Sequence, residues 1–224
     1  MQWCITCPIQ GPHQTVKHSP IGNEMRNPKA AEKASIQSIW SRIDAWFAEH
    51  WFTRPTLPPG ALESELAQVE SVVGSRLPRD ARESYLLHDG TGDLPLIPFG
   101  PWQVVFPLLG LAGMVGQWKM IQDAVRKGHF SGQDFVNHPK GPIRKTWFHQ
   151  RLLPIVDDQG GDYLFLDLAP ARGGKQGQII DFFRDAGATN VVAQGLRECL
   201  QRTALELESG KFKVDKKSRT LVPS

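Results

Sequence analysis

Four short apolar runs separated by turn-forming residues occupy the second half of the chain, and they constrain its fold most strongly. The runs cover residues 152–156, 163–168, 178–183 and 191–193. The segments between them are short and rich in Gly, Asp and Pro, which are the residues that favour turns. Consecutive strands joined by tight turns pair in antiparallel fashion, so the sequence predicts a meander sheet here.

Helical periodicity precedes and follows this predicted sheet. Apolar residues recur at three- and four-residue steps from Ile36 to Trp51, and Asn27 with Pro28 is typical of a helix N-terminus. Further helices are expected over residues 61–73, 78–90, 110–126 and 195–207, with proline-split edge strands over 94–109. Helices first, then a meander, then a closing helix indicate a single α+β domain in which N-terminal helices pack on the sheet.

Composition and the two chain ends narrow the class of protein. The net charge of +3 is small and dispersed, so we expect no direct binding of nucleic acid. No run reaches the roughly 18–20 apolar residues of a membrane span, so we expect a cytoplasmic protein without membrane contact. Residues 1–27 are interpreted as a disordered leader, 28–209 as the domain and 210–224 as a solvated basic tail. Met25 is an alternative start, which would leave residues 1–24 untranslated.

Cysteine usage offers no framework for disulfides or metal. Cys4 and Cys7 form a CxxC pair, but no second pair follows at zinc-finger spacing, and Cys199 is distant. We therefore expect neither a zinc site nor a disulfide framework.

Five aspartates lie in or beside the predicted strands, and a meander brings several of them to one end of the sheet. They are Asp157, Asp158, Asp162, Asp167 and Asp181. Three interpretations remain open: carboxylates that cap their own turns, an acidic patch for a basic partner, or a Mg²⁺ or Ca²⁺ site. Turn chemistry is the commonest of the three, and no EF-hand spacing exists, so no metal or other cofactor is expected.

Candidate catalytic groups lack the partners that catalysis needs. His88 and Asp89 suggest a general base, but no nucleophile elbow accompanies them, and Cys199 has no evident base. The glycine-rich loop 172–177 lacks the order of a phosphate-binding loop. We expect no enzymatic activity, although a hydrolase using Asp162 and Asp167 remains an alternative that alanine substitution would test.

Short motifs occur along the chain in a distinctive order. They are Leu77-Pro78, Tyr85-Leu86, Gly90, Trp147, Leu153-Pro154-Ile155, Gly160-Gly161-Asp162, Leu166-Asp167-Leu168 with Pro170, Gly174 and Gly177-Gln178-Ile179-Ile180. Together they resemble the SUKH superfamily, in the branch that holds yeast cell-wall-assembly regulators and many bacterial toxin-immunity proteins. The resemblance covers about residues 35–207, and it is poor in detail between residues 90 and 147.

This resemblance implies a non-enzymatic protein whose role is to bind another protein. We expect an immunity protein that neutralises a cognate bacterial toxin through one face of the sheet and the flanking acidic turns. The expected partner-binding residues are Trp147, Asp157, Asp158, Asp162 and Asp167. The alternative is a regulatory or scaffold protein of the cell-wall-assembly type. The sequence identifies neither the toxin nor the oligomeric state.

Overall fold

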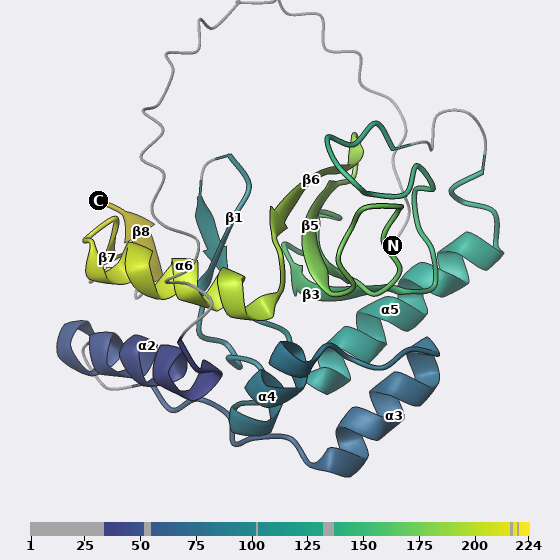
Figure 1. The fold of residues 1–224 in the computed structure, drawn as a ribbon. Coiled ribbons are helices and arrows are strands. Elements are labelled where there is room, and N and C mark those ends of the chain that lie inside the picture. Colours follow the sequence, from purple (N-terminus) through teal and green to yellow (C-terminus); the bar gives the residue numbers. More distant parts are fainter. Residues whose placement is uncertain (1–33, 52–54, 102, 132–136, 216, 219) are drawn as a thin grey trace, which may run out of the picture.

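The computed structural model describes residues 34–51, 55–101, 103–131, 137–215, 217–218 and 220–224. In chain order, the elements are α2 (Ile36–His50), α3 (Glu63–Val73), α4 (Arg79–Leu87), β1 (Ile97–Phe99), β2 (Val104–Phe106), α5 (Leu111–Arg126), β3 (Leu152–Asp157), β4 (Tyr163–Asp167), β5 (Gln178–Phe183), β6 (Gly187–Ala193), α6 (Leu196–Glu208), β7 (Phe212–Asp215) and β8 (Thr220–Pro223). This order confirms the predicted α+β fold (Figure 1).

The predicted meander is the central sheet of the structure. Its strands lie in the order β3-β4-β5-β6, and every neighbouring pair is antiparallel. Because successive side chains of a strand point to opposite faces, Leu164 and Leu166 of β4 enter one apolar core, whereas Tyr163 and Phe165 enter another. The sheet therefore separates two cores.

Both faces of this sheet are covered. Helices α2, α3, α4 and α6, with the β1–β2 hairpin, bury the first face, and Ile121 of α5 with Trp147 and Phe148 buries the second. Every residue of β4 and all but the last of β3 and β5 are buried. An antiparallel sheet often leaves one face to water; in the described part of this chain the two cores cover most of both faces, so neither face is open as a whole for recognition.

The helix boundaries follow local capping chemistry. Helix α2 begins at Ile36, where Ser35 accepts a hydrogen bond from the amide of Ser38 at 3.0 Å. The predicted cap at Asn27 and the leader over residues 1–27 lie outside the described residues. Helix α3 ends at Gly74, whose φ of 69° is the left-handed conformation that glycine adopts readily.

The C-terminal segment differs from its prediction as a solvated tail. Strands β7 and β8 pair as an antiparallel hairpin, and Phe212 and Leu221 are each only 3% exposed. Both side chains belong to the first core. Because the basic residues alternate with apolar ones, the hairpin exposes Lys213 and buries its neighbour Phe212.

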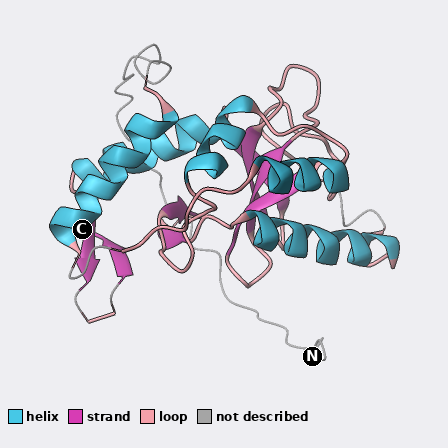
Figure 2. Ribbon diagram, turned by 90° about the horizontal axis from the view of Figure 1, so that it is seen from below, coloured by secondary structure: helices cyan, strands magenta, loops and turns pink. Residues whose placement is uncertain are grey.

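The elements are arranged so that α6 lies between the central sheet and the N-terminal helix. Helices α2 and α6 lie side by side, and α5 runs along the edge strand β3 (Figure 1). The view from below places the C-terminal hairpin at one end of the molecule and the main sheet toward the other (Figure 2). Among the described residues, none of the helices is long and apolar enough to cross a membrane.

Candidate functional site

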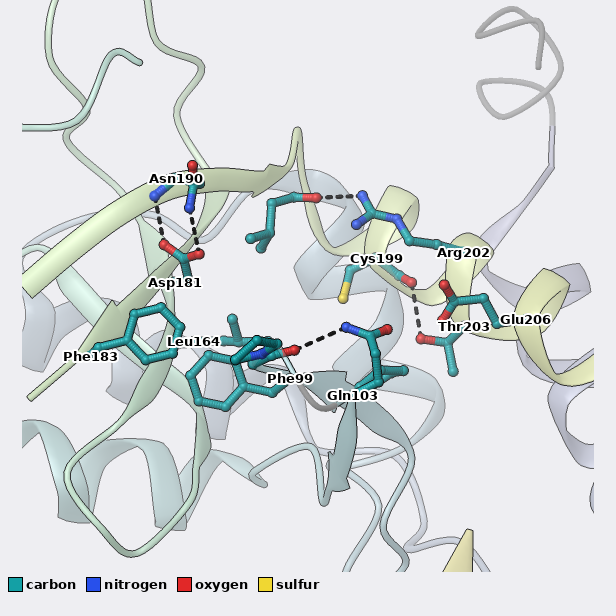
Figure 3. A pocket seen from close by; sticks show the side chains of 14 residues that line it. Phe99, Gln103, Leu164, Asp181, Phe183, Asn190, Cys199, Arg202, Thr203 and Glu206 are labelled. Atoms are coloured by element: carbon teal, nitrogen blue, oxygen red, sulfur yellow. Dashed lines mark hydrogen bonds between the residues drawn. The ribbon is translucent and has the colours of Figure 1, made fainter. Parts of the chain in front are cut away.

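A pocket of about 470 Å³ opens where α6, the β1–β2 hairpin and the first face of the main sheet meet (Figure 3). The hairpin contributes Pro98, Phe99, Gly100, Pro101 and Gln103; the sheet contributes Leu164, Asp181, Phe183, Asn190 and Val192; and α6 contributes Cys199, Arg202, Thr203 and Glu206. Pockets that bind small molecules or side chains usually occupy about 300–1,000 Å³, so this one has sufficient size.

One wall of the pocket is aromatic. The rings of Phe99 and Phe183 stack nearly parallel, with centroids 5.6 Å apart and an interplanar angle of 12°. Phe106 meets Phe99 edge-on at 6.1 Å and supports it from the paired strand. This wall joins two segments that are far apart in the sequence, and aromatic ring faces carry the negative side of the ring quadrupole.

A buried carboxylate lies next to this wall. Asp181 is 7% exposed, and it points to the pocket side of the sheet at an irregularity in the β5–β6 pairing. Its Oδ1 accepts hydrogen bonds from the Thr189 amide, the Thr189 hydroxyl and the Asn190 amide at 3.2, 2.6 and 2.6 Å. Its Oδ2 accepts one from Asn190 Nδ2 at 3.0 Å (Figure 3).

The opposite wall carries paired charges from α6. Arg202 donates to the Val192 carbonyl and lies 3.4 Å from the Glu198 carboxylate. Lys211, just before the C-terminal hairpin, forms an ion pair with Glu206 at 2.5 Å and donates to Gln103 Oε1 at 3.0 Å. Lys211 thereby connects α6 to the tip of the β1–β2 hairpin and holds two sides of the pocket together.

Gln103 occupies an unusual backbone conformation at this tip. Its φ of 53° lies in the left-handed region, which few residues other than glycine adopt. Its side-chain amide donates to the Gly100 carbonyl at 3.1 Å, which closes the turn of the hairpin. The side chain thus stabilises a strained turn and accepts the bond from Lys211 at the same time.

The thiol in the pocket is not activated. Burial raises the pKa of Cys199 to about 11, and the nearby Arg202 only partly offsets this effect. The thiolate is the nucleophilic form of cysteine, so Cys199 is almost entirely in its unreactive thiol form at neutral pH.

The predicted acidic turn lies at the same end of the sheet as the pocket. It comprises Asp157, Asp158 and Asp162, all partly exposed. Asp158 Oδ1 accepts from the Gly160 and Asp162 amides at 2.6 and 2.9 Å, while Asp162 Oδ1 accepts from the amide of Arg184 at 2.9 Å. Each carboxylate therefore stabilises the local backbone, as the turn interpretation predicts. Burial raises the pKa of Asp157 above its ordinary value.

The other two predicted residues lie in the interior. Asp167 has no exposed surface; it accepts from Gln178 Nε2 at 3.1 Å and lies 3.8 Å from His149. Trp147 is 6% exposed and meets Phe182 edge-on at 5.4 Å. The structure therefore does not bring the five predicted residues together: three lie at a surface turn, and two support the second core.

Burial also controls protonation in this interior region. Burial and the nearby Arg144 and Arg151 lower the pKa of His149 to about 4, so the imidazole is neutral at pH 7. Burial raises the pKa of Asp167 above its ordinary value. Neither residue lines the pocket described above, and their contact lies beside the second core.

Sequence reasoning identified Asp181 only as one of several aspartates and missed the rest of the pocket. A carboxylate inside an apolar strand was the one available signal. Phe99 and Gln103 lie in a proline-rich segment that carries no periodic pattern. Within the described ranges, no group of three or more His, Cys, Asp or Glu residues is arranged to hold a metal ion.

Comparison with known proteins places this architecture in a family. The model of the SMI1 / KNR4 family (SUKH-1) matches residues 60–202, which is more than half of the 224 residues. The chain belongs to the SMI1 / KNR4 family (SUKH-1). The match includes the main sheet, the β1–β2 hairpin and the first half of α6, so the hairpin and sheet walls of the pocket lie within the SMI1 / KNR4 segment, whereas Thr203 and Glu206 of α6 lie just beyond it.

Relatives of the SMI1 / KNR4 family from fungi match most of this chain. The chain is 29% identical over 87% of its length to "Cell wall biosynthesis/cell cycle regulator smi1" of Schizosaccharomyces pombe. It is 29% identical over 91% of its length to "Glucan synthesis regulatory protein" of Neurospora crassa, and 24% identical over 77% to "Cell wall assembly regulator SMI1" of Saccharomyces cerevisiae. The chain spans only 40%, 45% and 40% of the length of these relatives, respectively.

These relatives correct the functional prediction from sequence. The leading prediction, an immunity protein for a bacterial toxin, is wrong, because these three relatives are named as fungal regulators of the cell wall or of glucan synthesis. A fold does not dictate a function, so the motifs that indicated the superfamily leave the role open. The alternative prediction, a regulator of cell-wall assembly, fits the relatives better.

Proposed function

We propose that this chain is a regulatory protein of the cell-wall-assembly type, which acts by binding other proteins and catalyses no reaction. The observation that carries the proposal is the similarity to fungal cell-wall and glucan-synthesis regulators over 87% and 91% of this chain. Since the chain spans less than half of each of these relatives, we assign to it the protein-binding role and not every activity of the longer proteins.

The chemistry of the described residues supports a binding role. The Cys199 thiol is protonated at neutral pH, and the carboxylates of the acidic turn are engaged by backbone amides. A nucleophile or general base needs a matched pKa and a free lone pair within reach of a substrate. A partly exposed acidic turn and an open pocket with charged and aromatic walls instead favour recognition of a partner.

The partner surface that we propose is narrower than the one predicted from sequence. Asp157, Asp158 and Asp162 are partly exposed and remain candidates for partner contact. We propose no direct partner contact for Trp147 and Asp167, because they are only 6% and 0% exposed. Replacing either would weaken binding only by disturbing the second core.

A domain exchange in yeast tests the proposed function. In Saccharomyces cerevisiae, the segment of "Cell wall assembly regulator SMI1" that matches this chain would be replaced by the chain itself. We expect this chimera to restore wall glucan content and resistance to wall-digesting enzymes in a strain that lacks the native gene. A fluorescent tag on the same chimera tests the expected cytoplasmic location.

The control is a chimera with a disrupted fold. Phe165→Ala removes a fully buried ring from the second core and should abolish restoration. A chimera that accumulates to the native level and leaves the wall defect unchanged would refute the proposed function.

A further inference from the structure

We propose that the pocket between α6, the β1–β2 hairpin and the main sheet binds an arginine or lysine side chain from a basic segment of a partner protein. This inference names the partner chemistry for the protein-binding role proposed above and rests on that role. Three features carry it: an unbalanced carboxylate, an aromatic wall and a neighbouring acidic turn.

The charges around the pocket leave one carboxylate without a cation. Arg202 is paired with Glu198, and Glu206 is paired with Lys211. Among the described residues, Asp181 has hydrogen-bond donors but no ion-pair partner, although it is only 7% exposed. Charges buried in proteins are generally paired, so a cation supplied from outside would complete this site.

Asp181 retains the capacity to accept a further donor. Three hydrogen bonds converge on Oδ1, whereas Oδ2 accepts only one, from Asn190 Nδ2 at 3.0 Å. An ionised carboxylate offers about four acceptor positions over its two oxygens. A guanidinium or ammonium group entering the pocket can therefore donate to Oδ2 without displacing the existing bonds.

The aromatic wall suits the rest of a basic side chain. Phe99 and Phe183 lie on the same side of the pocket as Asp181, across from Arg202 and Glu206 of α6 (Figure 3). Guanidinium and ammonium groups are attracted to aromatic ring faces, and the aliphatic stem of either side chain packs on apolar surface. Leu164 adds such surface next to the rings.

The acidic turn extends the preference for basic side chains beyond the pocket. Leu164 of β4 lies two residues after Asp162, and Asp162 Oδ1 accepts from the amide of Arg184, the residue after Phe183. Asp157, Asp158 and Asp162 thus lie at the sheet end that also forms the aromatic wall. A partner segment with several basic residues can place one side chain in the pocket and others against the turn, where opposite charges speed association.

Capped peptides provide the test. The probe is acetyl-Gly-Gly-Arg-Gly-Gly-amide, and its matched control carries citrulline, a neutral side chain of almost the same shape, in place of arginine. Binding is followed by two-dimensional NMR of the ¹⁵N-labelled chain, using the Asn190 side-chain amide and the backbone amides of Phe183 and Val192. We expect the arginine peptide to shift these signals saturably, with a Kd at least about tenfold lower than that of the citrulline peptide.

Two matched substitutions locate the charge that matters. Asp181→Asn should weaken binding of the arginine peptide at least about tenfold, whereas Asp185→Asn, which removes the same charge from a side chain that is 86% exposed, should change it less than about twofold. Phe183→Leu should weaken binding while leaving the carboxylate in place. A cooperative thermal unfolding transition checks that each variant is folded. If Asp181→Asn does not fold, the binding of Phe183→Leu and the comparison of arginine with citrulline peptides still test the proposed pocket.

Several results would overturn the proposal. They are the absence of shifts at the pocket up to about 10 mM peptide, equal affinity for the arginine and citrulline peptides, or shifts confined to the acidic turn. The yeast chimera separates this failure from that of the proposed function. A chimera carrying Asp181→Asn that restores the wall fully, with no peptide bound at the pocket, would refute the pocket and leave the regulatory role intact.

Discussion

Phe212→Ala tests whether the C-terminal hairpin is part of the folded domain. Phe212 is 3% exposed and packs in the first core, which also receives Leu221 from the paired strand. Truncating a buried Phe to Ala costs about 3–5 kcal/mol, through lost burial and the cavity that remains. Loss of the contact between the Lys211 ammonium and the Phe212 ring, 5.6 Å from its centroid, adds less than about 1 kcal/mol.

The assay is urea unfolding followed by tryptophan fluorescence and circular dichroism. Since folded proteins are stable by only about 5–15 kcal/mol, the expected loss is a large share of the total. Lys213→Ala is the matched control, because it changes an exposed side chain on the same strand and should cost less than about 0.5 kcal/mol. A loss below about 1 kcal/mol for Phe212→Ala would refute the reasoning and restore the interpretation of a solvated tail.

Two further predictions concern a close contact and a buried imidazole. Gly177→Ala should destabilise the fold by at least about 1–3 kcal/mol more than Gly173→Ala: both glycines have positive φ, but a Cβ at Gly177 would lie 2.2 Å from the Pro78 ring, whereas a Cβ at Gly173 meets nothing within 4 Å. Equal losses in thermal unfolding would contradict this contact. Because the pKa of His149 is lowered to about 4 in the fold, the unfolded chain binds the proton first, and stability should fall by about 3 kcal/mol between pH 6.5 and 4. The raised pKa of Asp167 has the opposite effect on stability, because the folded chain binds this proton at a higher pH than the unfolded chain does. His149→Gln should therefore reduce the loss of stability between pH 6.5 and 4, measured by urea titrations at each pH. An unchanged dependence of stability on pH would contradict this role of His149.

The fold could be predicted from sequence where local chemistry agrees with tertiary structure. The meander was predictable because turn residues such as those at 157–161 separate short apolar runs, and the structure places strands at each run. Helix α3 ends at Gly74 as predicted, because a left-handed residue can be recognised from its type alone. Strand β6 begins at Gly187, whereas the sequence predicted a start at residue 191. The residues before 191 are not consistently apolar, and their pairing with β5 makes them a strand.

The candidate site was far less predictable. Phe99, Asp181 and Arg202 come from three elements separated by long stretches of sequence, and only the fold brings them around one pocket. The burial of Asp167 had no local signal either, since an aspartate is rarely fully buried even where it lies within a predicted strand. The hairpin at the C-terminus was missed because its basic residues outnumber the two apolar side chains that anchor it.

Helix α2 has a practical consequence for handling this protein. The segment recognised as characteristic of the family starts at residue 60, yet Ile39, Ile43 and Phe47 of α2 are at most 1% exposed. On the far side of that segment, Phe212 fills part of the same core. A fragment trimmed to residues 60–202 would cut α6 after Arg202, remove its buried residues Ala204 and Leu207, and expose the core that α2 covers, so we expect it to aggregate. A unit that keeps the first core covered on both sides of α6 therefore runs from Ser35 through Pro223.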